Sequence, residues 1–233
     1  MLYGETGKMP IRLQINKRII AYWCKIILDK DNKLISILYK NLLYKYNNGT
    51  YKSLWLDNVK NILDKCGLSY VWQQQGFLSK GRLLSLIETR LKDQFRQEWN
   101  SNKSNTSKGK TYNCIKPEFN QESYMFLPKT ISLPLLKFRT ANHLLPVERG
   151  RWRNIPYLER YCSLCQNQCV GDEYHVLFEC PAFLTERKLF LKQEFIVRPN
   201  FYKFNLLFKQ NHLSLLRKLS KFVRIIMDKF KEQ

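Results

Sequence analysis

Apolar residues recur every three or four positions in five segments of the chain. This spacing places side chains on one face of an α-helix and is typical of amphipathic helices. The five segments are residues 11–29, 33–46, 55–67, 81–99 and 212–233. The pattern predicts a mainly α protein, folded as a helical bundle.

The last segment, 212–233, has the most regular pattern. Its apolar stripe comprises Leu215, Leu216, Leu219, Phe222, Val223, Ile226 and Phe230. Its basic residues lie mainly away from that stripe and comprise Arg217, Lys218, Lys221 and Arg224. We expect a core helix with a solvated basic face, although a helix bound to a membrane surface or to a partner has the same pattern.

Polar residues and helix breakers divide the chain. Residues 101–113 are rich in Ser, Asn and Lys, which predicts a linker or loop between helical regions at 1–100 and 114–233. Gly67 stands where a C-cap glycine would end the third helix. Further along we expect a helix over 132–146 interrupted near Pro134, a basic loop over 148–160, and a helix over 181–195 with Pro181 in its first turn.

Charge narrows the class of partner. The 233 residues contain 40 Lys and Arg against 19 Asp and Glu, a formal net charge of +21. Such an excess is tolerated best where a polyanion neutralises it, which favours RNA or DNA as partner.

The sequence has no signal peptide and no apolar run that could span a membrane, and seven cysteines without a secretory signal indicate a reducing compartment. We therefore expect an intracellular protein, nuclear or cytoplasmic and not secreted.

A cysteine-rich stretch carries the clearest chemical signal. Cys162, Cys165, His175 and Cys180 follow the spacing C-x2-C-x9-H-x4-C, in which two ligand pairs are separated by a loop. Three thiolates and one imidazole suit tetrahedral Zn²⁺. Because four ligands fill the coordination shell, the predicted zinc is structural, and its binding contributes to folding.

Some alternatives stay open at this stretch. Cys169 could replace one of the four ligands, and the residues could also be reduced thiols, a redox C-x-x-C pair or a nucleophilic Cys/His pair. Asp172 stands where a helix N-cap would hold His175 in the first turn. Glu173 could cap the same helix or orient a ligand.

The run from Leu135 to Leu191 resembles the C-terminal zinc-binding region of reverse transcriptases from non-LTR (LINE-like) retrotransposons. The resemblance rests on Lys137, Phe138, Arg139 and His143, on Gly150, Arg151 and Trp152, and on Cys162, Cys165, Asp172, Glu173, His175, Cys180 and Pro181. Segments of the N-terminal half, such as LYGETGKMPI, also fit the part that precedes this region. The zinc-binding module would span about 135–195.

The resemblance implies a fragment without polymerase activity. Polymerases of this kind hold two Mg²⁺ ions on paired aspartates, whereas the seven aspartates here are scattered and include no Asp-Asp dipeptide. We therefore expect a non-enzymatic C-terminal fragment, derived from a retrotransposon, that binds RNA or DNA; a polymerase or other protein partner is not identified by the sequence. The residues expected to contact nucleic acid are Lys137, Arg139, His143, Arg149, Arg151, Trp152 and Arg153.

Three other functions compete with this one. The zinc could only stabilise a module whose helices bind a protein, or the chain could be a relic of a decayed element. A zinc hydrolase would need an open metal position and a general base, for which only Glu173 stands near the ligands. Four good ligands argue against that third alternative.

Overall fold

The computed structural model of the protein describes residues 1–29 and 33–232. Helices account for 69% of the described residues, and no β-strand forms among them. Two isolated bridges pair Thr6 with Gln121 and Tyr161 with Val170. The prediction of a mainly α protein is confirmed.

The chain divides into two compact units. One unit comprises Met9–Glu98, and the other comprises Met1–Lys8 together with Trp99–Gln233. The first eight residues thus belong with the C-terminal part of the chain. The polar composition of residues 101–113 did not predict that the division falls after Glu98. It also did not predict that the first eight residues pack with the C-terminal unit.

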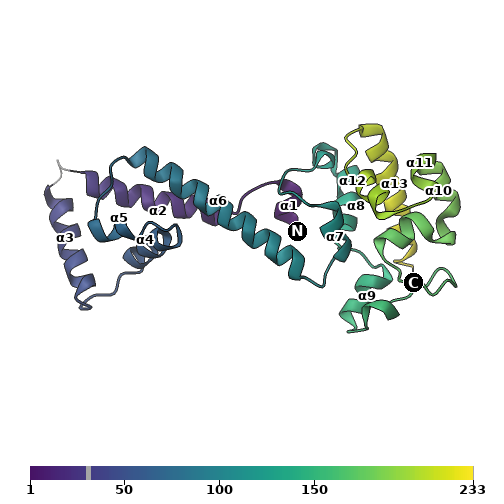
Figure 1. The fold of residues 1–233 in the computed structure, drawn as a ribbon, viewed down its shortest axis with the longest axis horizontal. Coiled ribbons are helices and arrows are strands. Elements are labelled where there is room, and N and C mark those ends of the chain that lie inside the picture. The colour runs from purple at the N-terminus through teal and green to yellow at the C-terminus, as the bar shows by residue number, and fades with distance from the viewer. Residues whose placement is uncertain (30–32, 233) are drawn as a thin grey trace. The chain divides into compact units, whose positions relative to one another are not determined.

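The unit Met9–Glu98 is a set of helices (Figure 1). They enclose an aromatic and aliphatic core. Its helices are α2 (Ile11–Leu28), α3 (Lys33–Asn47), α4 (Leu54–Lys65), α5 (Ser69–Gln74) and the first part of α6 (Lys80–Asn105). Trp23, Leu63 and Ile87 are buried in this core. Gly67 follows α4 with φ +62°, which confirms the predicted C-terminal glycine.

Helix α3 is only partly covered by the core. The side chains of Leu34 and Leu38 are 66% and 58% exposed, whereas Tyr39 and Leu42 pack against the core. A hydrogen bond of 2.8 Å from Trp23 Nε1 to the Tyr39 hydroxyl also joins α3 to α2. Periodicity therefore located α3 but did not show how much of it is covered.

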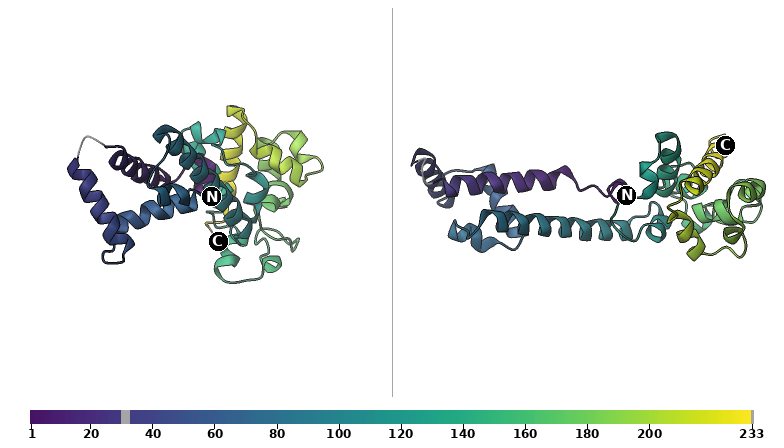
Figure 2. Two further views of the ribbon diagram at one scale, coloured as in Figure 1. Left: turned by 60° about the vertical axis from the view of Figure 1, so that its left-hand side comes forward. Right: turned by 90° about the horizontal axis from the view of Figure 1, so that it is seen from above.

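The other unit is built on the pair α8 and α13, which pack against each other (Figure 2). Its elements are α1 (Leu2–Thr6), α7 (Lys110–Ile115), η1 (Ser123–Phe126), α8 (Lys129–Arg139), α9 (Pro146–Trp152), η2 (Tyr157–Glu159), η3 (His175–Glu179), η4 (Pro181–Phe183), α10 (Leu184–Phe190), α11 (Gln193–Ile196), α12 (Phe201–Phe208) and α13 (Leu213–Lys229).

Helix α13 has the predicted amphipathic character. Its buried stripe includes Leu216, Phe222 and Ile226, while Arg217 and Arg224 are exposed. Since the stripe packs on α8, the expectation of a core helix is confirmed; Gln233, at the end of the predicted segment, lies outside the described residues. No helix of the described chain is long and apolar enough to cross a membrane.

The predicted linker is helical at both ends. Helix α6 continues to Asn105 and α7 begins at Lys110. The continuation has a tertiary cause, because buried Trp99 anchors α6 and Lys103 lies 4.5 Å above its ring while donating to the Lys116 carbonyl at 2.8 Å. Polar composition alone did not reveal these contacts.

Three further features differ from the sequence predictions. The predicted interruption at Pro134 is absent, because this proline lies inside α8. It removes only one backbone hydrogen bond, the one to the carbonyl of exposed Thr130. The expected basic loop at 148–160 begins as helix α9, with Pro146 at its first turn. The expected helix at 181–195 is interrupted at Leu191. The backbone of Leu191 is extended, so α10 ends there, and the Leu191 side chain is buried.

Candidate metal centre

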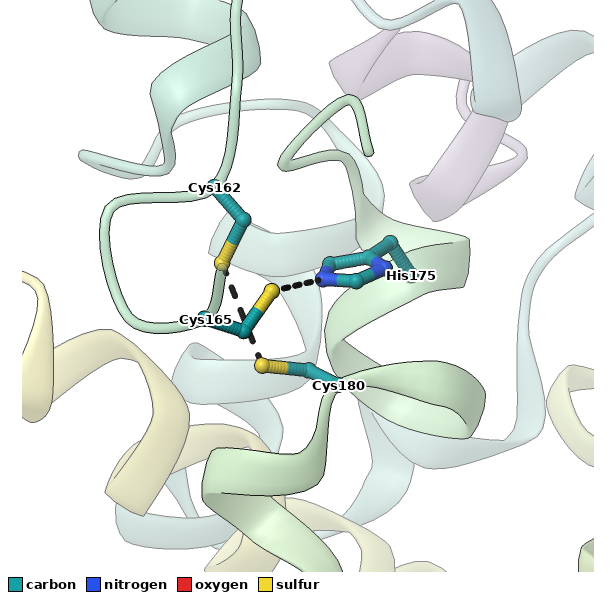
Figure 3. Close-up of side chains that lie close together, drawn as sticks. All are labelled: Cys162, Cys165, His175 and Cys180. Atoms are coloured by element: carbon teal, nitrogen blue, oxygen red, sulfur yellow. Dashed lines mark hydrogen bonds between the residues drawn. The ribbon is translucent and has the colours of Figure 1, made fainter. Parts of the chain in front are cut away.

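The first ligand pair lies in a closed loop. The bridge between Tyr161 and Val170 is reinforced by a backbone bond of 2.9 Å from Cys162 N to Cys169 O. The loop between them presents Cys162 and Cys165 on one side (Figure 3). Cys169 is not part of this cluster, and its thiol donates to the Asn167 carbonyl at 3.3 Å.

The second ligand pair is brought together by the π-helical turn η3. The Cys180 N–H donates to the His175 carbonyl at 2.8 Å, across five residues. This wider turn is a local departure from the α-helix that is frequent at functional sites. Asp172 Oδ1 accepts from the His175 N–H at 2.9 Å, which confirms the predicted cap.

The four side chains converge on one point. The donor atoms of Cys162, Cys165, His175 and Cys180 all lie within 4.8 Å of one another. The sulfurs of Cys162 and Cys180 are 3.9 Å apart, and Cys165 Sγ is 3.4 Å from His175 Nε2 (Figure 3). These are the four residues predicted from spacing, and they are positioned to bind a metal ion.

The distances can be tested against a tetrahedral shell. With Zn–S bonds of about 2.3 Å and a Zn–N bond of about 2.0 Å, two sulfurs lie about 3.8 Å apart, and a sulfur and a nitrogen about 3.5 Å apart. The separations of Cys162 Sγ from Cys180 Sγ and of Cys165 Sγ from His175 Nε2 are close to these values, and the four donor atoms all lie within 4.8 Å of one another. Four such ligands can fill a tetrahedral shell, the arrangement typical of structural rather than catalytic zinc sites.

The cluster stabilises one thiolate, at Cys162, without a metal ion. The hydrogen bond from the Cys180 thiol lowers the pKa of Cys162 to about 4, while the same bond raises the pKa of Cys180. Burial lowers the pKa of His175, but its contacts with Cys162 and Glu179 outweigh burial and raise the pKa overall. The two cysteines share one proton, which a metal ion would displace.

Glu179 is the carboxylate that faces a ligand. Its Oε2 lies 3.4 Å from His175 Nδ1, which leaves Nε2 directed at the cluster. Such a partner orients the imidazole and fixes its tautomer. Sequence reasoning named Glu173 for this part, although the spacing of four residues between His175 and Glu179 was the available signal.

Glu173 instead holds His143. Its Oε1 lies 2.9 Å from His143 Nε2, and both side chains are buried. The other ring nitrogen of His143 accepts from the Leu145 N–H at 3.4 Å. The expectation that Glu173 orients a ligand is therefore wrong, and Glu173 is not available as a general base at the cluster.

Arg187 is the residue that sequence reasoning missed. Its buried guanidinium donates to the carbonyls of Leu177 at 2.7 Å and Cys180 at 2.9 Å, where the π turn ends. Burial lowers the pKa of Arg187, yet an arginine stays charged in proteins. Three thiolates and one divalent cation carry a net charge of about −1, which this cation offsets.

The residues expected to contact nucleic acid fall into two groups. Arg139 and His143 are buried, with 1% and 5% exposure, and they are held by Glu5 and Glu173. They do not share a helical face either, since α8 ends at Arg139. Their burial therefore does not fit the expected contact with nucleic acid.

The second group has access to solvent. Lys137, Trp152 and Arg153 are exposed, and Arg151 is half-buried with its Nε 2.7 Å from Glu148 Oε2. Arg149 is also half-buried and donates to the Phe230 carbonyl at 2.6 Å. The exposed members remain candidates for contact with an anion.

Helix α9 is attached to the metal-binding loop. The Val147 N–H donates to Gly171 O at 3.2 Å, and Arg160 Nη1 donates to Val147 O at 3.0 Å. A Cβ at position 150 would clash with the Arg160 side chain, which explains the glycine there. These contacts couple the helix that ends at Trp152 to the loop that carries Cys162.

Known proteins supply no further assignment. No family model, no curated protein and no solved structure matches this chain. The resemblance to retrotransposon reverse transcriptases stays a prediction, and the site is interpreted from its own donor atoms.

Proposed function

We propose that this protein is a nucleic-acid-binding module held together by structural zinc. The donor set carries the metal part of the proposal: three sulfurs and one imidazole nitrogen, at separations close to those of a tetrahedral zinc shell. Magnesium and calcium prefer oxygen ligands and do not suit this set. Zinc supplies no reaction here; it holds the loop around Cys162 against the turn that ends at Cys180.

The charge of the chain supports the binding part of the proposal. A net charge of +21 opposes compact folding unless counter-charges are recruited, and a phosphate backbone provides them. Exposed Lys137, Trp152 and Arg153 combine cations with an aromatic ring. This combination suits binding that tolerates many sequences and weakens steeply with salt.

The resemblance adds an origin to the proposal. On that basis the protein is a C-terminal fragment derived from a non-LTR retrotransposon reverse transcriptase, and it has no polymerase activity of its own. The sequence lacks an Asp-Asp dipeptide, which supports the second statement. Such a fragment retains the ability to bind RNA or DNA.

The test is binding to a labelled single-stranded RNA of about twelve nucleotides across a salt series. The zinc-loaded protein is compared with Cys165→Ser, and zinc content and helicity are measured for both. We expect binding that falls steeply with salt in the zinc-loaded protein and is weakened in the variant.

Cys169→Ser is the matched control, because Cys169 lies near the cluster without belonging to it. It should keep both zinc and affinity. Folded, zinc-loaded protein without affinity for RNA or DNA at low salt would contradict the proposal and direct attention to a protein partner.

A further inference from the structure

A cleft of about 390 Å³ lies between α8, the segment that follows it, the end of α9, and α13. Its lining includes Lys129, Lys137, Trp152, Arg224, Asp228 and Lys231. Only two of these, Lys137 and Trp152, combine exposure with a role expected from the sequence. The remaining members come together only through the packing of α13 on α8.

The charge along this cleft is strongly positive. Lys129, Lys137, Arg224 and Lys231 line it against a single carboxylate, Asp228. That carboxylate already accepts from Lys231 Nζ at 2.6 Å. Within the described chain the other three cations pair with no carboxylate, so the cleft attracts an anion.

An aromatic surface borders the same cleft. Trp152 is 53% exposed, whereas Trp23, Trp72 and Trp99 are each less than 10% exposed. The Arg151 guanidinium lies 6.0 Å from its ring centroid. An exposed indole in the same cleft as unpaired cations can stack on a planar base while the cations contact the neighbouring phosphates.

We infer that this cleft binds single-stranded nucleic acid, with one base stacked on Trp152 and adjacent phosphates on Lys137 and Arg224. The inference rests on the proposed function and adds its site and strand form. A base inside a duplex is stacked on its neighbours and cannot reach an indole without being unpaired. The volume of the cleft is that of a small-ligand site and suits one nucleotide.

The cleft is also tied to the metal centre. Trp152 ends α9, which is bonded to Gly171 and Arg160 beside the metal-binding loop. His143 lines the cleft and is held by Glu173, two residues before His175. The position of the indole and of one cleft wall therefore depends on the segment that the metal would fix.

The experiment measures affinity of the full, zinc-loaded chain for labelled single-stranded RNA, single-stranded DNA and a duplex of the same sequence. Trp152→Ala should weaken binding of the single strand about tenfold, and Trp152→Phe should stay within about threefold of the parent because phenyl also stacks. The double variant Lys137→Gln with Arg224→Gln should reduce the slope of log K against log salt by about 1.4, for two lost phosphate contacts.

Two exposed residues of the same unit serve as controls. Tyr202→Ala removes an aromatic side chain that is 74% exposed, and Lys218→Gln removes an exposed cation of α13; neither lines the cleft. Both controls should bind like the parent. A base stacked on Trp152 should also quench tryptophan fluorescence in the parent and in Tyr202→Ala, with the quenching lost in Trp152→Phe.

The outcomes separate this inference from the proposed function. If the parent binds and the cleft variants, checked for zinc and helicity, bind equally well, the cleft is overturned while nucleic-acid binding stands. If the duplex binds as tightly as the single strand, the stacking geometry is wrong. If the zinc-loaded parent binds none of the three ligands, both proposals fall. Single-strand binding that the cleft variants weaken and the two controls retain supports the cleft, and the ratio of RNA to DNA affinity identifies the preferred sugar.

Discussion

Arg139 and Glu5 form a buried ion pair although 134 positions separate them in the sequence. Arg139 Nε donates to Glu5 Oε2 at 2.8 Å and Nη2 donates to Glu5 Oε1 at 3.2 Å. The exposed fractions of the two side chains are 1% and 0%. The Tyr124 hydroxyl donates to the same carboxylate. The pair joins α1 to the end of α8 and explains why the first eight residues belong to this unit.

Removal of the cation should destabilise that unit severely. Arg139→Met leaves the Glu5 carboxylate buried without its charge partner, which costs about 3–5 kcal/mol of unfolding free energy. Urea denaturation followed by tryptophan fluorescence measures the change in unfolding free energy. Lys192→Ala is the control, since Lys192 and Glu194 form an exposed pair worth at most about 1 kcal/mol. Equal losses for the two variants would contradict a structural role for Arg139.

The metal centre should hold one zinc ion per chain. Cys165→Ser, His175→Ala and Cys180→Ser each remove a ligand and should abolish stoichiometric zinc in elemental analysis, whereas Cys169→Ser should retain it. Because structural zinc contributes to folding, a strong chelator should also lower the unfolding temperature of the parent. Full zinc retention in Cys180→Ser would mean that Cys169 or another group completes the shell.

Arg187 should affect the metal centre without being a ligand. Arg187→Met removes the donors to the Leu177 and Cys180 carbonyls and the charge that offsets the thiolates. We expect zinc affinity to fall about 10–100-fold, the range found for residues that orient metal ligands. Competition with a chromogenic chelator measures it. Lys188→Met, at the exposed neighbouring position, should leave the affinity unchanged.

The unit Met9–Glu98 should show an acid-dependent contribution from Glu88. Hydrogen bonds from Lys17 and Lys92 lower the pKa of Glu88 to about 2 from 4.5. Because the folded pKa is below the unfolded one, the stabilisation is complete above about pH 4.5 and is lost as pH falls towards 2. The difference in urea midpoint between the parent and Glu88→Gln should therefore shrink over that interval.

The contribution of Glu88 is modest, since all three side chains are partly exposed. High salt should reduce it further. A carbon-detected NMR titration of the Glu88 carboxyl gives the direct check. An ordinary glutamate pKa in the folded protein would contradict the ion-pair geometry.

Local sequence determined the elements whose information is contained within one turn or one loop. Periodic apolar residues located α2, α4, α6 and α13, because a helix places every third or fourth side chain on one face. The four ligands were identified for a similar reason: a C-x2-C pair on one tight loop and a His-x4-Cys pair on one turn bring the donors together by short-range geometry.

The tertiary structure decided everything that depends on residues far apart in the sequence. The sequence could not show that Arg139 faces Glu5, that His143 faces Glu173 or that Arg187 meets the carbonyls beside Cys180, since each contact forms only after the helices pack. The same packing extended α6 past Trp99, broke the helix at Leu191 and left Leu34 and Leu38 of α3 exposed. Burial turned two expected anion contacts into internal ones, and the approach of α13 to α8 placed Arg224 in one cleft with Lys137 and Trp152.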